Sequence, residues 1–294
     1  MMFKKVAWNG IGLSVPEAWE PASLEHQFIR LGESGVVRAD LQWRRIRGPF
    51  AAERHVRKLA KRFRSKGLCI IDPPDEWASA VESLHTSGLV AVFVHWQGGC
   101  GAVVHNPATG LAATLQFYDH EDSANPQAMT VLESFRDHWA GATLPWRMFG
   151  LRARIPANFL LQKFSFVPGR GLLMFRRLKR EPSIDASARD FGRGPGMTLE
   201  LERLVPADVV LQKKAVSAWA PDYCAARIRG AIREQDDSIA WRERETRFLR
   251  KPTLHCGQVW LDAEHNALLG VYAQGNTDLS SKQFTEVCSH YGAV

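Results

Sequence analysis

The sequence of 294 residues lacks any long apolar run. Its longest uninterrupted one, Leu89–Val94, is far shorter than the 18 or more residues that a membrane span requires. Lys4 and Lys5 stand near the N-terminus, but no apolar stretch follows them, so the pattern of a secretory signal is missing. We therefore expect no membrane span and a cytoplasmic location.

The sequence is also poor in cysteine and in catalytic motifs. Its five cysteines are odd in number and widely spaced, which favours reduced thiols over a disulfide framework: Cys69, Cys100, Cys224, Cys256 and Cys288. It contains no phosphate-binding loop, no nucleophile elbow, no His-Glu-x-x-His motif and no Cys-x-x-Cys motif. These absences favour a protein without enzymatic activity and without a cofactor.

Two groups of histidine and cysteine deserve comparison with metal sites. His95, Cys100 and His105 form the first, and His255, Cys256 and His265 form the second. Thiolates and imidazoles are good zinc ligands, but structural zinc sites usually have regular ligand spacing, and these groups do not. Buried cysteines that pack as small apolar residues are common. We therefore predict that no metal is bound.

What the sequence does contain is an excess of positive charge, with a formal net charge of +7. Seven cations fall within the predicted helix 50–66, opposed only by Glu53: Arg54, Arg57, Lys58, Lys61, Arg62, Arg64 and Lys66. Such a face is either solvated or bound to an acidic protein partner. Nucleic acid is not the expected partner, because nucleic-acid surfaces usually add aromatic or polar readers. We predict Arg57, Lys61 and Arg64 as binding residues.

Tryptophan is abundant, with ten residues. Packing in a core is the usual role of so large an apolar side chain. Tryptophan and arginine are also enriched at protein-binding hot spots. The pairs Trp43-Arg44 and Trp241-Arg242 have this composition, and we predict Trp43, Arg44 and Trp241 as exposed binding residues.

The two halves of the sequence resemble each other. The segment Gly10–Pro16 returns as Gly150–Pro156, and Cys100-Gly101 returns as Cys256-Gly257. The offsets differ, which indicates an insertion, and the Arg-, Gly- and Pro-rich stretch 176–196 is the candidate for that inserted loop. The pattern predicts two tandem repeats, residues 1–145 and 146–294.

Each repeat is expected to be α+β, with one antiparallel sheet covered by helices. Alternating apolar residues predict a strand over 11–15, and further strands are predicted over 78–85 and 89–96. Pro49 is expected to open a helix that ends near Gly67. Strands joined by tight turns pair antiparallel, and helices between them cover a face of the sheet.

One resemblance follows from this order of elements. A strand that closes with Val15-Pro16-Glu17-Ala18-Trp19, then a hairpin, a helix, antiparallel strands and a final helix, resembles the PsbP-like (DcrB-type) domain. The resemblance covers about residues 3–140 and, more faintly, 147–292. It implies a scaffold without a shared active site and a binding or assembly role.

The predicted function is therefore that of a non-enzymatic scaffold or adaptor protein built from two repeats. The alternative is an enzyme or small-ligand-binding protein with its site in the groove between the two halves, because clefts between domains are common ligand sites.

Overall fold

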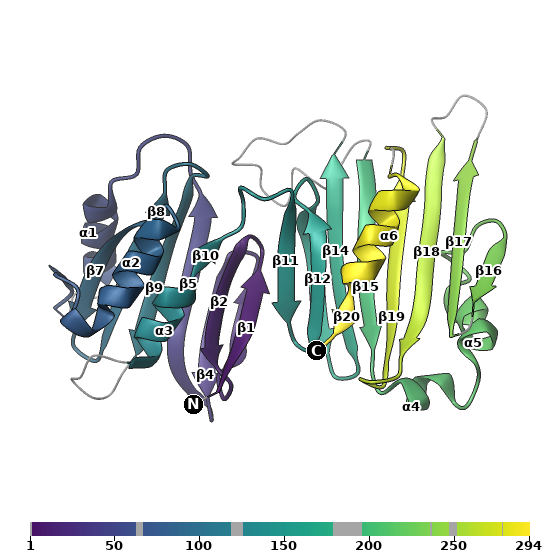
Figure 1. The fold of residues 1–294 in the computed structure, drawn as a ribbon, viewed down its shortest axis with the longest axis horizontal. Coiled ribbons are helices and arrows are strands. Elements are labelled where there is room, and N and C mark those ends of the chain that lie inside the picture. Colours follow the sequence, from purple (N-terminus) through teal and green to yellow (C-terminus); the bar gives the residue numbers. More distant parts are fainter. Residues whose placement is uncertain are drawn as a thin grey trace. The chain divides into compact units, whose positions relative to one another are not determined.

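The structure is a computed structural model that describes residues 2–62, 67–118, 126–178, 196–235, 237–246, 252–277 and 279–294. The chain divides into two compact units, Met1–Gly141 and Ala142–Val294 (Figure 1). Most of the predicted loop 176–196 lies outside the described residues.

The first unit is built on a seven-stranded antiparallel sheet. Its strand order is β3 (Glu20–Glu25), β4 (Phe28–Glu33), β5 (Val36–Arg45), β9 (Leu111–Tyr118), β8 (Gly99–Asn106), β7 (Val90–Trp96) and β6 (Cys69–Ile71). Outside this sheet, β2 (Ile11–Pro16) pairs with β1 (Phe3–Trp8) and β10 (Arg136–Asp137). The helical elements are α1 (Ala52–Arg62), the 3-10 turn η1 (Asp75–Trp77), α2 (Ala78–Thr86) and α3 (Pro126–Ser134).

The second unit also has a seven-stranded antiparallel sheet. Its order is β13 (Leu160–Val167), β14 (Arg170–Leu178), β15 (Gly196–Leu204), β19 (Ala267–Gly275), β18 (Thr253–Asp262), β17 (Ser238–Glu245) and β16 (Ile232–Gln235). Outside it, β12 (Leu151–Pro156) pairs with β11 (Thr143–Met148) and β20 (Gly292–Ala293). The helices are α4 (Ala207–Leu211), α5 (Val216–Tyr223) and α6 (Ser281–His290).

The predicted fold class, one helix-covered sheet per half in an α+β arrangement, is wrong. The fold is mostly β, with 52% of the described residues in strands against 21% in helices. Strands β1, β2 and β10 stay outside the seven-stranded sheet because β2 pairs with β1 along its whole length and with β10 at Ile11 and Gly12. The turn after Pro16, where the amide of Trp19 donates to the Pro16 carbonyl, then directs the chain away.

One predicted strand is also wrong. Residues 78–86 form helix α2. Ala80 and Leu84 lie four residues apart and are both buried, the spacing of one helical face. The helix packs on α3, so tertiary packing decides the conformation of a segment whose local pattern is ambiguous.

The two seven-stranded sheets share one strand order. Reading along each sheet, β3-β4-β5-β9-β8-β7-β6 corresponds to β13-β14-β15-β19-β18-β17-β16. The register also corresponds. Cys100 lies opposite Phe117 in the first unit, and Cys256 lies opposite Ala273 in the second. Both members of the second pair follow their counterparts by the same number of residues along the chain. Gly10 and Gly150 take positive φ in the two-residue turns β1–β2 and β11–β12, as such hairpins require.

The units differ in the segment that joins the two strands at one edge of each sheet, β6 and β7 in the first unit and β16 and β17 in the second. In the first unit, η1 and α2 lie between β6 and β7. In the second unit, β16 ends at Gln235 and β17 begins at Ser238, so a short turn replaces the helix. Across the described ranges, no helix is long and apolar enough to cross a membrane.

Candidate functional site

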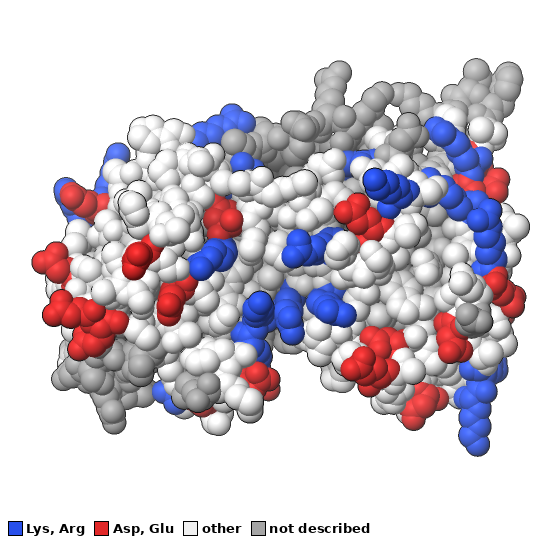
Figure 2. Space-filling model, viewed as in Figure 1, with Lys and Arg blue, Asp and Glu red and all other residues white. Residues whose placement is uncertain are grey.

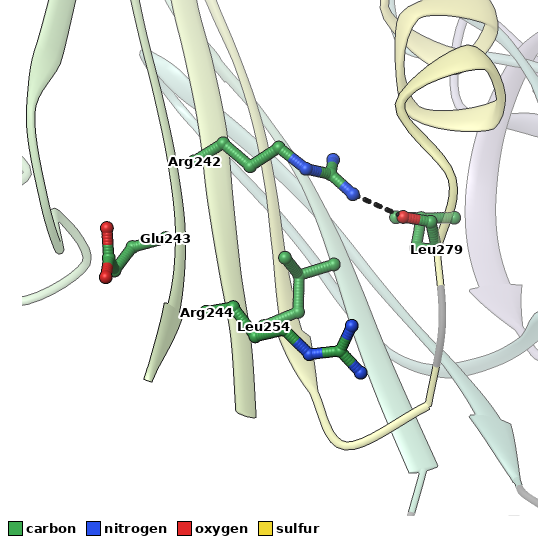
Figure 3. Close-up of a pocket in the computed structure, with 5 residues that line it drawn as sticks. All are labelled: Arg242, Glu243, Arg244, Leu254 and Leu279. Atoms are coloured by element: carbon green, nitrogen blue, oxygen red, sulfur yellow. Dashed lines mark hydrogen bonds between the residues drawn. The ribbon is translucent and has the colours of Figure 1, made fainter. Parts of the chain in front are cut away.

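A surface cavity lies in the second unit at one end of β17 and β18. Its volume is about 310 Å³, and it is lined by Arg242, Glu243, Arg244, Leu254 and Leu279 (Figure 3). Two guanidinium groups and two leucine side chains provide both charge and an apolar floor. This composition suits a partner that carries carboxylates beside apolar groups.

The alternation of β17 sorts its charged side chains between the two faces of the sheet. Arg242 and Arg244 point toward Leu279, whereas Glu243 between them points the other way (Figure 3). Successive side chains of a strand point to opposite faces, so the sequence Arg-Glu-Arg gives one face two positive charges. The carboxylate of Glu243 therefore does not lie between the arginines.

The start of α6 forms the opposite wall of the cavity. Arg242 Nη2 donates to the Leu279 carbonyl oxygen at 2.6 Å, which ties β17 to the segment before the helix (Figure 3). Ser280 then caps α6: its Oγ accepts from the Gln283 amide at 3.1 Å, and the Gln283 side chain accepts from the Ser280 amide. These bonds fix the cavity wall in one geometry.

Beyond the cavity, the face of β17 and β18 that carries Arg242 is only partly covered. Helices α2 and α3 lie together over the first unit, whereas α6 lies alone over the second, beside β18 (Figure 1), and Ala240, Gln258 and Trp260 of β17 and β18 are partly exposed. In the same view, Lys and Arg side chains lie over and around these strands, with Asp and Glu side chains among them (Figure 2). The missing counterpart of α2 thus leaves part of a sheet face open to solvent.

The buried charges of the second unit are engaged with one another. Glu202 is 1% exposed, and its Oε1 accepts from Arg170 Nε at 2.7 Å and from the Tyr223 hydroxyl at 2.8 Å. Arg227 Nη1 lies 3.5 Å from Glu202 Oε2, and Arg227 Nη2 is bonded to Glu200. We call these five residues the Glu202 cluster. Because each guanidinium faces a carboxylate, the cluster ties α5 and the chain after it to the sheet.

Burial also raises the pKa values of two tyrosines beside this cluster, Tyr223 and Tyr272. Burial, and next the neighbouring Glu202 carboxylate, raise the pKa of Tyr223 to about 12. Burial also raises the pKa of Tyr272, whose ring lies 4.3 Å from the Arg227 guanidinium. Both phenols therefore stay protonated at neutral pH, and Tyr223 acts as a hydrogen-bond donor.

The thiols of the second unit are buried and weakly acidic. Burial raises the pKa of Cys256 to about 11 and that of Cys288 to about 12, and it raises the pKa of Cys224 as well. The thiolate is the reactive form of cysteine, so these three side chains are poor nucleophiles. Within the described ranges, no three His, Cys, Asp or Glu side chains gather closely enough to hold a metal ion.

The structure separates the residues that were predicted to bind a partner. Trp43 and Trp241 are each 3% exposed, and their indole Nε1 groups donate to the Asn9 and Arg227 carbonyls. The prediction that these tryptophans are exposed is therefore wrong. Both sit at buried positions of their strands, where large apolar side chains stabilise the core.

The charged residues of that prediction lie at the surface. Arg44 is exposed on β5, and Lys61 is exposed on α1. Arg57 is also exposed and lies 3.5 Å from Glu53, one turn earlier in the helix. Arg64 lies outside the described residues. A binding role for these residues stays a prediction.

Sequence reasoning missed Glu243, Arg244, Leu254 and Leu279, which are all of the cavity residues except Arg242. The alternating Arg-Glu-Arg of β17 is the one signal in the sequence that could have indicated a face with two cations. Leu279 is brought to this face by the chain path before α6, which no local pattern reveals.

No protein-family model and no curated protein matches the chain. The PsbP-like resemblance therefore stays a prediction that rests on the order of elements and the Val15–Trp19 motif. The alternative of an enzyme or a small-ligand-binding protein also stays a prediction.

Proposed function

We propose that the protein is a non-enzymatic binding protein, made of two copies of one sheet unit, whose second unit binds an acidic segment of a partner protein. The shared strand order and register of the two units support a duplication. One observation carries the binding role: Arg242 and Arg244 project together onto a sheet face on which, among the described residues, no counterpart of α2 lies.

The remaining ionisable groups of the second unit favour binding over catalysis. The Glu202 cluster pairs its carboxylates with guanidinium and phenol groups, and the buried thiols are held protonated. A general acid or base must instead reach a substrate proton with a pKa near the working pH. Arg242 and Arg244 cannot serve as bases, because guanidinium groups stay protonated.

The test uses two baits, the wild-type chain and Arg242→Glu/Arg244→Glu. Proteins retained only by the wild type are identified by mass spectrometry, purified and titrated with the chain at low and high salt. We expect a partner with an acidic segment, with affinity at least tenfold lower for the variant and decreasing with salt because the attraction is screened.

The matched control is Arg57→Glu/Lys61→Glu, which makes the same change in net charge on α1 of the first unit. It should retain the partner. Partners held equally by wild type and by Arg242→Glu/Arg244→Glu would contradict the proposed site, and loss of the partner from the α1 variant alone would move the site to α1.

A further inference from the structure

The two units can be compared at equivalent positions of the sheet face that α2 covers. In the first unit, Phe93, Ala102 and Val104 are 5%, 0% and 0% exposed. The Trp77 ring of η1 packs edge-on against Phe93, with ring centroids 5.8 Å apart. The segment η1–α2 therefore completes the burial of this face.

The equivalent positions in the second unit are only half-buried. By the shared register, Ala240, Gln258 and Trp260 occupy the places of Phe93, Ala102 and Val104, and all three are partly exposed. Trp260 packs edge-on against Tyr291, the residue that follows α6. The side chains on this face of β18 form a strip from Trp260 to Leu254. The strip lies beside α6 and ends at the arginines of the cavity.

The length of this strip matches a helix of the size of η1–α2. Leu254 and Trp260 lie six residues apart on β18, which is about 20 Å at the strand rise of about 3.3 Å. At a rise of about 1.5 Å, a helix of about 13 residues spans the same distance. A polar loop would leave Trp260 exposed, whereas the apolar face of an amphipathic helix would cover it.

The positive charges at one end of the strip indicate that such a helix would carry acidic side chains. By the shared register, Arg242 takes the place of His95, which is exposed in the first unit, and Arg244 lies two residues further along β17, so both cations stand at one end of the strip, while Glu243 points the other way (Figure 3). We infer that this face of the second unit binds an acidic amphipathic helix of the α2 kind, supplied by a partner protein, with its apolar side chains over the positions that α2 covers in the first unit and its carboxylates toward Arg242 and Arg244. The inference rests on the proposed function and adds the form of the bound segment.

The segment η1–α2 itself has the required chemistry and supplies the probe. Residues 74–88 combine the apolar side chains of Trp77, Ala80 and Leu84 with three carboxylates, Asp75, Glu76 and Glu82. A synthetic peptide of this sequence, acetylated and amidated at its ends and carrying a fluorophore, is titrated with the full chain. Anisotropy reports the affinity, and circular dichroism reports helix formation.

We expect saturable binding that increases the helix content of the peptide. Arg242→Glu/Arg244→Glu should weaken the affinity at least tenfold, as should replacement of the three peptide carboxylates by lysine. Lys213→Glu/Lys214→Glu makes the same change in net charge at two exposed lysines of the second unit that do not line the cavity, and it should keep the affinity within about twofold. Ala240→Trp fills the strip without changing charge and should also abolish binding.

Absence of binding at peptide concentrations up to about 1 mM, the weak end of specific association, overturns the inference. Binding that is equal in the wild type and in the Arg242 and Ala240 variants also overturns it, because the peptide would then occupy another surface. If the peptide fails while a captured acidic partner still depends on Arg242 and Arg244, the proposed function stands and only the helical form is wrong.

Discussion

Replacing Arg227 by methionine tests whether the Glu202 cluster stabilises the second unit. The change keeps much of the side-chain volume but removes the guanidinium that bonds to Glu200, lies 3.5 Å from Glu202 and sits 4.3 Å from the centroid of the Tyr272 ring. The Arg227 side chain is 28% exposed and Glu202 is 1% exposed, so water replaces little of what is lost.

The expected loss can be assembled from these contacts. A hydrogen bond to a charged group is worth about 1.5–3 kcal/mol. A partly desolvated cation–π contact adds about 0.5–2 kcal/mol. Breaking a buried ion pair costs about 3–5 kcal/mol when one charge remains. Arg170 and Tyr223 still hold Glu202 Oε1, so the lower end applies, and we expect a loss of about 3 kcal/mol.

The assay is urea unfolding of the full chain, followed by tryptophan fluorescence and by circular dichroism. Arg57→Met is the matched control, because Arg57 is 78% exposed and its partner Glu53 is 70% exposed. Exposed pairs one helical turn apart contribute about 0.3–0.5 kcal/mol. A loss below about 1 kcal/mol for Arg227→Met, or a loss no larger than that of Arg57→Met, would refute the assignment of a stabilising role to the cluster.

Further predictions concern pH, thiol reactivity and packing. Because the folded-state pKa of Tyr223 is raised, its contribution to stability is complete below the unfolded value of about 10 and is lost as pH rises toward about 12; urea unfolding between these pH values should show a shallower decline for Tyr223→Phe. A thiol reagent at pH 8 should label the exposed Cys69 rapidly and the three buried thiols of the second unit only after unfolding, as peptide mapping would show; equal rates would contradict their burial. Gly257→Ala should lower the thermal midpoint, because a Cβ there would lie 2.2 Å from Trp241 Cζ2 and overpacking costs about 1–3 kcal/mol; an unchanged midpoint would show that the indole moves freely.

Local pattern was sufficient for several elements of the fold. The alternation of Ile11, Leu13 and Val15 marks β2, and Gly10 and Gly150 mark the turns of the hairpins β1–β2 and β11–β12. The apolar stripe of the basic segment marks α1. These features could be predicted because each depends on residues adjacent in the chain, whose periodicity reports which side is buried.

Burial of individual side chains could not be predicted in the same way. Trp43 and Trp241 stand beside arginines in the sequence, but their strands place them on covered faces. The Glu202 cluster joins β14, β15 and the chain that follows α5, residues that lie up to 57 positions apart (Arg170 to Arg227). No spacing in the sequence indicates such a cluster, because strand pairing over long separations creates it.

The sequence by itself determined the recurrence of the motif Gly10–Pro16 at Gly150–Pro156, the strands over 11–15 and 89–96, and the excess of positive charge. Tertiary structure decided how the strands divide between sheets, because β2 pairs not only with its neighbour β1 but also, at Ile11 and Gly12, with β10, more than a hundred residues away. It also decided where the candidate site lies: a helix between β6 and β7 covers one face in the first unit, a short turn between β16 and β17 leaves the same face open in the second, and the side chains of Arg242 and Arg244 project there. Both connecting segments can be read in the sequence, but only the folded sheets show that they join equivalent strands and therefore leave the same face covered in one unit and partly exposed in the other.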